Sequence, residues 1–380
     1  MCASKDKSPS PSQGQPSLQS PASIPDLLVP SFGGLPSDSQ PEAWTIPWGQ
    51  PMRQSEHVSA APSSTRPSNP LSAKDAELDF SNLELFCPIN ADEITTRWMN
   101  PWIPVPGQTI KQYPPGVSNF VSRILKSYAA IAARGRGTLP FIHPSQILEQ
   151  ETGSPLTTCL SLIRLCESPL PGNESTAFMV FQREMDNIME YHESYNALEL
   201  LGAFQAFLIY FLALFFKLPD QGTQSDLRSN MMNLQTLAHR SAKQGLMCVT
   251  DQNRTRPRWE EWIITETKRR TLYVMYLFDS VLSTQEALPT FLATELLGLP
   301  ASASKYLWYA RSRTEWEQAY NIHLAEWADK SLSIDELWPV PADMNEPDIA
   351  ERSKRVDDWL EEIDEFGTML YAVTSCTHGG

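Results

Sequence analysis

The fold is decided by the stretch RWEEWIITETKRRTLYVMYLFD, which runs from Arg258 to Asp279. Large apolar side chains recur in and just after this stretch at steps of three and four, a spacing that places them on one face of an α-helix. Pro257 is predicted to lie in the first turn, because proline lacks the N–H that a helix start leaves unpaired. The apolar positions are Trp259, Trp262, Ile263, Tyr273, Val274, Leu277 and Val281.

A charged pair interrupts this apolar face. Glu266 and Arg270 are four residues apart with the acid first, the favourable order for an ion pair along a helix, and Arg269 offers a second partner. The position predicts a buried or half-buried bridge, which fixes geometry more than it adds stability. Two interpretations are a ligand-sensing or catalytic pair and a structural bridge between helices, and we favour the structural bridge.

Helical spacing recurs along the rest of the chain, and no segment shows the alternating pattern of a strand. One helix is predicted to begin with Ser118 as its cap and to stop at Gly135 and Gly137. Residues Leu83 to Ile89 are expected to be extended and to pack on the core. The sequence therefore predicts an all-α, multi-helix bundle. Further helices are expected over Leu156–Cys166, Phe178–Tyr195, Leu198–Phe216, Leu227–Leu246 and Ile349–Leu370.

The most hydrophobic run, Leu198 to Phe216, approaches the ~20 apolar residues of a membrane span. Glu199, Gly202 and Gln205 interrupt its first half, and amphipathic helices surround it in the sequence. We interpret it as the central helix of a bundle, hydrophobic on all sides because neighbouring helices enclose it. No membrane contact is expected.

The last predicted helix combines an apolar side with an acidic surface. Its apolar residues include Trp359 and Phe366. Two roles stay open for it: docking a partner or a second copy of the chain, or closing the bundle with a solvated acidic face. The acidic surface is expected to hold Asp357, Asp358, Glu361, Glu362, Asp364 and Glu365.

Residues 1–76 differ in composition from the rest, being rich in Ser, Pro and Gln. They are predicted to form a disordered segment, because too little apolar surface is available to offset chain entropy. Two apolar islands, Ile24–Val29 and Trp44–Trp48, are either partner-binding motifs or incidental hydrophobic residues in a linker. Residues 77–380 are assigned to a single helical domain.

Charge and cysteine spacing restrict the function classes. The net charge of −15 makes generic nucleic-acid binding unfavourable, and Lys268, Arg269 and Arg270 lie on a helix whose other face is predicted to be buried. No Cys-x-x-Cys pair or zinc-spaced histidine pair is present, so the cysteines are interpreted as reduced thiols of an intracellular protein. The six cysteines are Cys2, Cys87, Cys159, Cys166, Cys248 and Cys376.

No catalytic, cofactor-binding or metal-ligating residues are predicted. His143 lies between apolar residues and a proline with no acid close in sequence, and His192 is interpreted as a satisfied residue on an apolar stripe. The sequence holds no Gly-rich phosphate loop or nucleophile motif, so an enzyme is not expected.

Several short motifs in order resemble the regulatory region of fungal-specific transcription factors, also called the middle homology region. These motifs are Phe141-Ile142-His143-Pro144, Trp259 to Thr271, Pro289 with Glu295-Leu296, Leu299-Pro300, Leu307-Trp308 and Glu315-Trp316. The resemblance covers roughly the last four-fifths of the chain. It implies a nuclear protein that controls transcription in a fungus, often of a metabolic or secondary-metabolite biosynthetic gene set.

The chain departs from that family's pattern by lacking the closely spaced cysteines of its zinc-based DNA-binding module. We therefore expect a regulator that acts through protein partners, either a DNA-binding factor or another copy of itself. Whether it also contacts DNA directly or takes a small-molecule effector stays open. The alternative is a helical protein-interaction scaffold with no direct role in transcription.

Overall fold

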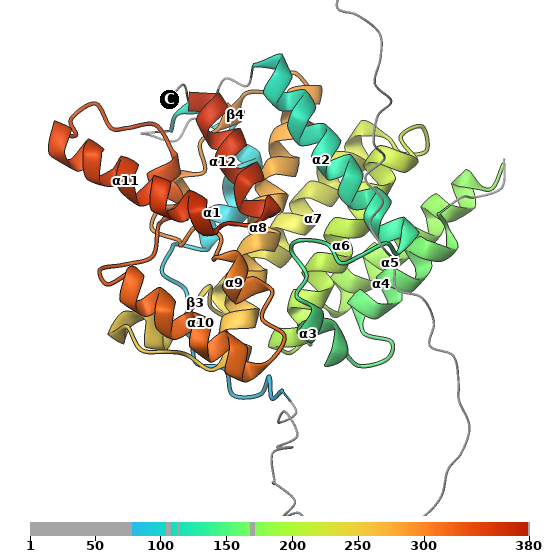
Figure 1. Ribbon diagram of the computed structural model, residues 1–380. Coiled ribbons are helices and arrows are strands. Elements are labelled where there is room, and N and C mark those ends of the chain that lie inside the picture. Colours follow the sequence, from blue (N-terminus) through green and yellow to red (C-terminus); the bar gives the residue numbers. More distant parts are fainter. Residues whose placement is uncertain (1–77, 104–107, 112–113, 168–171, 379–380) are drawn as a thin grey trace, which may run out of the picture. The chain divides into compact units, whose positions relative to one another are not determined.

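The computed structural model describes residues 78–103, 108–111, 114–167 and 172–378 (Figure 1). All of them belong to the second of two units of the chain, residues 70–380. Helix makes up 65% of the structure, which confirms the all-α prediction. The predictions for residues 1–76, with the islands Ile24–Val29 and Trp44–Trp48, fall outside the described residues.

The helices follow one another along the described chain, and short strands and 3₁₀ turns lie in several of the connections (Figure 1). Their bounds are α1 Asp92–Thr96, α2 Pro115–Arg134, α3 Pro144–Leu148, α4 Pro155–Leu165, α5 Glu174–Tyr191, α6 Ala197–Lys217, α7 Gln224–Lys243, α8 Trp259–Gln285, α9 Lys305–Trp308, α10 Arg313–Glu326, α11 Glu346–Glu362 and α12 Glu365–His378. Short 3₁₀ turns cover η1 Arg97–Met99, η2 Val249–Asn253, η3 Thr294–Leu296 and η4 Ile334–Leu337.

Helix α6 lies at the centre of the bundle, as expected from its composition. It packs against α2, α4, α5, α7 and α8. Asn196 and Glu199 start it with reciprocal hydrogen bonds between side chain and backbone, so Glu199 marks the helix start rather than an interruption. The helix is long and apolar enough to cross a membrane, but 83% of that apolar stretch is buried inside the protein.

Helix α8 confirms the helix predicted around Glu266, with two corrections. It starts at Trp259 after the cap residue Arg258, whose backbone N–H donates to Glu261 Oε2 at 3.1 Å, so Pro257 precedes the first turn. Every residue from Trp259 to Ser283 is buried, so Lys268, Arg269 and Arg270 face protein rather than solvent. Protein therefore encloses the helix on all sides. The sequence did not predict this, because charged residues are usually exposed to solvent.

The predicted boundaries of α2 are half correct. The helix starts at Pro115, so Ser118 lies inside it, and its backbone N–H donates to Pro114 O at 3.3 Å. A proline at the first position costs no hydrogen bond, and it replaces the predicted serine cap. The helix ends as predicted at Gly135, whose φ of +62° is the left-handed conformation that favours glycine.

Helix α5 begins and ends four residues earlier than the predicted range Phe178–Tyr195. It ends at Tyr191, and the partly buried His192 follows as its C-terminal cap residue. The Nδ1 atom of His192 lies 2.5 Å from Met189 O, which satisfies the ring locally. The interpretation of His192 as a satisfied residue is confirmed, but its place within the helical stripe is wrong.

The predicted last helix is in fact two helices. Helix α11 ends at Glu362, Ile363 takes an extended backbone with ψ of 160°, and α12 begins at Glu365. The break turns Asp364 inward, where it is 6% exposed, so its assignment to the acidic surface is wrong. The apolar side is otherwise as expected, because Trp359, Ile363 and Phe366 are buried.

Two pairs of short strands join distant parts of the described chain. β1 (Leu85–Phe86) pairs antiparallel with β3 (Met247–Cys248), so the middle of the segment Leu83–Ile89 is extended as expected. β2 (Ile110–Lys111) pairs antiparallel with β4 (Thr290–Phe291). At two residues each, these strands are too short to produce a readable alternation in the sequence.

Candidate functional site

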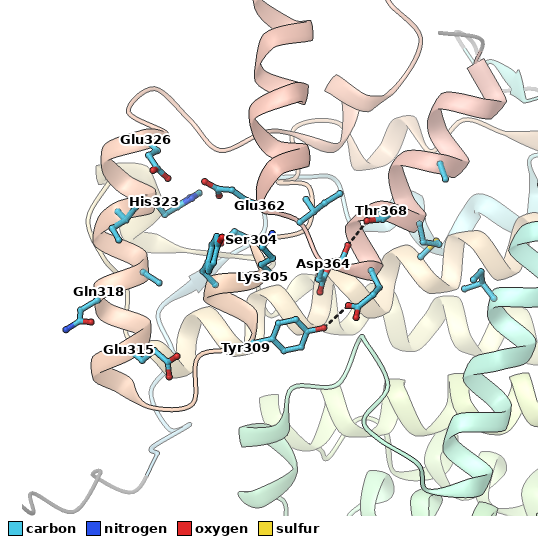
Figure 2. A pocket seen from close by; sticks show the side chains of 18 of the residues that line it. Ser304, Lys305, Tyr309, Glu315, Gln318, His323, Glu326, Glu362, Asp364 and Thr368 are labelled. Atoms are coloured by element: carbon cyan, nitrogen blue, oxygen red, sulfur yellow. Dashed lines mark hydrogen bonds between the residues drawn. The ribbon is translucent and has the colours of Figure 1, made fainter. Parts of the chain in front are cut away.

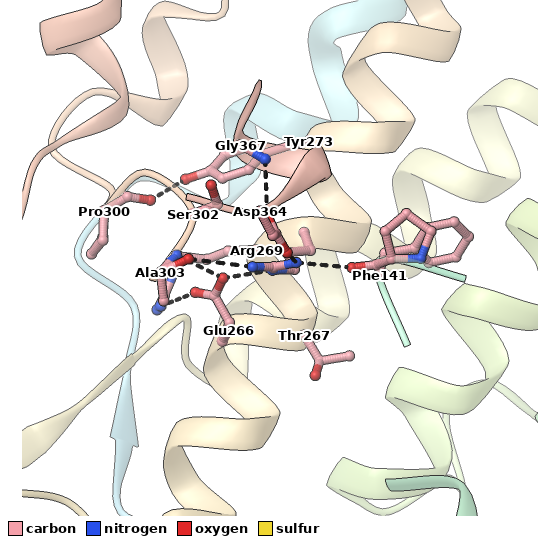
Figure 3. Close-up of polar contacts among 12 residues, drawn as sticks. Phe141, Glu266, Thr267, Arg269, Tyr273, Pro300, Ser302, Ala303, Asp364 and Gly367 are labelled. Atoms are coloured by element: carbon pink, nitrogen blue, oxygen red, sulfur yellow. Dashed lines mark hydrogen bonds and ion pairs between the residues drawn. The ribbon is translucent and has the colours of Figure 1, made fainter. Parts of the chain in front are cut away.

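The residues of the α8 charged pair form the centre of a buried polar cluster (Figure 3). Glu266 accepts hydrogen bonds from Arg269 Nη2 at 2.7 Å, from Arg270 Nε at 2.7 Å and from the backbone N–H of Ala303 at 2.9 Å. The side chains of Glu266 and Arg270 are completely buried. The ion pair predicted from the sequence is therefore confirmed, and it is the buried rather than the half-buried form.

Asp364 completes the cluster from the junction of α11 and α12. Its Oδ2 atom accepts from Arg270 Nη1 at 2.6 Å, and its Oδ1 atom accepts from the backbone N–H of Gly367 at 3.0 Å. Glu266, Arg269, Arg270 and Asp364 together carry two positive and two negative charges. We call these four residues the ionic hub.

Electrostatics keep the hub charged despite its burial. Burial alone would raise the pKa of Glu266, but Arg269 and Arg270 outweigh it and hold the pKa below its usual value. Burial would likewise lower the pKa of Arg270, yet Glu266 and Asp364 raise it. Desolvation offsets much of the attraction in such a cluster, so its main effect is to fix which segments meet.

An aromatic cluster covers one side of the hub. The Arg270 guanidinium lies 3.8 Å from the centre of the Trp308 ring, a cation–π contact. The edge-on contact between the Trp308 and His143 rings has a centroid distance of 5.0 Å, and the His143 ring also contacts Trp259 and Trp262. Trp308 therefore meets Trp259 and Trp262, which precede it by more than forty residues, around the His143 ring.

His143 has a structural position in this cluster. Its Nδ1 atom accepts from the backbone N–H of Ser145 at 3.3 Å and so caps the start of α3. Burial, reinforced by the nearby positive charge of Arg270, lowers the pKa of His143 to about 4. The ring is neutral at physiological pH, and its capping bond is made to the local backbone.

A second buried ion cluster involves the C-terminal half of α8. The sequence analysis did not predict it. Arg97 donates from Nε to Asp279 Oδ2 at 3.1 Å and from Nη1 to Glu295 Oε1 at 2.8 Å. Tyr276 also donates to Glu295, at 2.9 Å. Arg97 belongs to η1, nearly two hundred residues before its partners, so no local spacing could link them.

A surface groove lies beside the ionic hub (Figure 2). Its volume is about 1160 Å³. Helices α2, α10 and α12 contribute most of its apolar side chains, and the α11–α12 junction adds carboxylates. The lining residues are Phe120, Ile124, Ser304, Lys305, Tyr306, Tyr309, Glu315, Gln318, Ala319, Ile322, His323, Glu326, Glu362, Ile363, Asp364, Glu365, Thr368, Met369 and Ala372. We call this the α10–α12 groove.

Two carboxyl groups meet at one end of the α10–α12 groove. Figure 2 shows Glu362 directed toward Glu326 and His323 of α10. Burial raises the pKa of Glu362 to about 7, and the hydrogen bond and negative charge of Glu326 add to this effect. Burial lowers the pKa of His323 to about 4, so this ring does not neutralise the pair. Neither Glu326 nor His323 was singled out in the sequence, because they belong to a helix of mixed polarity.

The cysteines do not assemble a metal site in the described part of the chain. Cys87, Cys159, Cys166 and Cys248 are free thiols, and burial raises the pKa of Cys159 and Cys248 above the usual value. Within the described residues, no three His, Cys, Asp or Glu side chains are placed to hold a metal ion. Cys2 and the side chain of Cys376 lie outside the part that the structure describes.

Comparison of the chain with protein-family models, with curated proteins and with solved structures found no match.

Proposed function

We propose that the chain is a transcriptional regulator of the fungal-specific type, with residues 77–380 as its helical regulatory domain. The observation that carries the proposal is the meeting of the family-like motifs at one place. His143, Glu266, Arg270 and Trp308 come from three separate motifs and lie in direct contact. Motifs that matched by chance would have no reason to meet in one cluster, so their contact supports the resemblance.

The regulator acts through partners in this proposal. Within these 380 residues the cysteines lack zinc-cluster spacing and the net charge is −15, both unfavourable for direct contact with DNA. Recruitment by a DNA-binding factor would bring the chain to its target genes, and self-association would bring further copies of the chain there. The proposed location is the nucleus, and the proposed targets are metabolic or secondary-metabolite biosynthetic genes.

A helical interaction scaffold without a role in transcription is the second candidate. The exposed apolar surface of the α10–α12 groove favours it, because such surfaces mark protein-binding sites in any cellular context. In both candidates the chain binds and positions other molecules and does not catalyse a reaction.

Deletion of the gene in its host, combined with tagging of the protein, tests the proposal. We expect the tagged protein in the nucleus, its cross-linking to a limited set of promoters, and altered transcript levels from those promoters in the deletion strain. A cytosolic protein whose deletion leaves transcripts unchanged would leave the scaffold as the better account. Turnover of a substrate by the purified chain would overturn both.

A further inference from the structure

The α10–α12 groove exposes more large apolar side chains than solvation alone would favour. Ile322 is 57% exposed and Tyr306 62% exposed, and Phe120 and Tyr309 are also exposed. These four residues come from three separate segments, α2, α9 with the residue that follows it, and α10. A contiguous exposed apolar surface of this kind is typical of a site that another protein covers.

The charged side chains that line the α10–α12 groove indicate the charge of a complementary binding partner. The groove is lined by five carboxylates, Glu315, Glu326, Glu362, Asp364 and Glu365, and by one lysine, Lys305. Asp364 is neutralised by Arg270 of the ionic hub, and Lys305 Nζ donates to the backbone carbonyl of Glu361 at 3.0 Å. The net charge presented to an occupant is therefore negative, and the complementary occupant is positively charged.

We propose that the α10–α12 groove docks an amphipathic helix of a partner protein, with an apolar stripe flanked by lysine or arginine side chains. A helix laid in a groove buries one face and leaves the other in water. A helix bound in this way fits the α10–α12 groove, because several of the apolar side chains that line the groove are exposed. Small-molecule pockets instead enclose most of the ligand surface. This proposal rests on the proposed function for its role in the cell, and it adds the chemistry of the partner.

The carboxyl pair Glu326 and Glu362 should make the binding of this helix depend on pH. Glu362 faces Glu326 and His323 of α10 and Lys305 of α9, with Glu361 next to it on its own helix. A lysine or arginine of the partner placed at this end favours the ionised form of Glu362. Docking therefore releases a proton near pH 7, and affinity rises with pH until Glu362 is fully ionised in the free protein.

The test uses a fluorescein-labelled synthetic helix of leucine and lysine, with all leucines on one face, and the purified full chain. We expect saturable binding by fluorescence anisotropy that weakens as salt is added. The same leucine stripe flanked by glutamate should not bind. Titration calorimetry in two buffers of different ionisation enthalpy should show proton release. None of these measurements depends on transcription, so their failure is distinguishable from failure of the proposed function.

Variants inside and outside the α10–α12 groove test whether the synthetic helix binds there. Ile322→Asp places a charge on the apolar lining and should weaken binding ~10-fold or more. Leu165→Asp changes a residue that is 80% exposed at the end of α4, outside the groove, and should have no effect. Glu326→Gln with Glu362→Gln should weaken binding, lower its salt dependence and abolish proton release. Asp357→Asn with Asp358→Asn replaces two carboxylates on the exposed side of α11 by amides and should do none of these.

Two results would overturn the proposal. The first is equal binding of the leucine–lysine helix by the wild type and by the Ile322→Asp and Glu326→Gln, Glu362→Gln variants, with circular dichroism melting curves showing all of them folded. The second is a concentration-dependent dimer of the wild type that Ile322→Asp dissociates, which would make a second copy of the chain the occupant.

Discussion

Asp364 lies 2.6 Å from Arg270, although 94 residues of chain separate them. This contact closes the ionic hub and attaches the junction of α11 and α12 to the buried helix α8. The same junction forms part of the α10–α12 groove. The position of a surface that we propose to bind a partner is therefore set by a buried ion pair.

Removal of the Glu266 carboxylate should destabilise the fold strongly. Glu266→Ala leaves Arg269 and Arg270 buried with one shared partner missing, which costs ~3–5 kcal/mol in the free energy of unfolding. Chemical denaturation followed by circular dichroism measures the change. Asp357→Ala, on the exposed side of α11, is the control and should have little effect. An unchanged midpoint for Glu266→Ala would contradict the hub as described.

Neutralisation of Asp364 should loosen the C-terminal helices more than the centre of the bundle. Asp364→Asn keeps the shape of the side chain but loses a charged hydrogen bond worth ~1.5–3 kcal/mol. Hydrogen exchange followed by mass spectrometry should show faster exchange in α12 with little change in α6. Uniform exchange rates across both helices, at wild-type values, would rule out this role for Asp364.

Gly367 should tolerate no side chain. A Cβ atom added there would lie 2.7 Å from Ile363 Cβ and 2.9 Å from Ser302 Oγ, closer than such atoms pack. Gly367→Ala is therefore expected to lower the free energy of unfolding by ~1–3 kcal/mol. Gly116→Ala in α2, where nothing lies within 4 Å of the added atom, is the matched control. That control should be neutral or stabilising by up to ~1 kcal/mol, because alanine favours a helix more than glycine does.

Lys268 should make stability depend on pH. Burial lowers its pKa to about 7, and its Nζ atom donates to the Gly245 carbonyl at 3.2 Å. Above pH 7 the unfolded chain holds this proton and the folded chain does not, so stability rises with pH. The slope approaches ~1.4 kcal/mol per pH unit. Above about pH 8.5 the thiols of Cys159 and Cys248, whose pKa burial raises, act in the opposite direction.

Denaturation midpoints between pH 7 and 8.5 measure this effect. Lys268→Met should flatten the pH dependence and stabilise the protein at pH 7, whereas Lys354→Met on the exposed side of α11 should keep the wild-type slope. Parallel pH profiles of the wild type and Lys268→Met would show that Lys268 does not titrate in this range.

Local spacing predicted those parts of the structure that depend on residues close in sequence. The helical faces and the Glu266–Arg270 pair belong to this group, because partners four residues apart on a helix lie side by side. The position of Asp364 could not be predicted from local spacing. Its periodicity continued that of α11, so the sequence placed it on the surface, whereas the chain breaks at Ile363 and turns it inward. Arg97 was missed for a related reason, since its partners are brought to it only by the tertiary fold.

The enclosure of α8 has a consequence for the order in which the protein can fold. The backbone N–H groups of Asp79 and Glu84 donate to Glu260 and Glu261 in its first turn, and Asp364 binds Arg270 near its middle. During synthesis residue 364 leaves the ribosome last among these, so Arg270 gains its second acid only after that residue has emerged. A product truncated before Asp364 would keep Arg269 and Arg270 with one hub acid, Glu266. The unbalanced buried charge would favour recognition by chaperones and proteases.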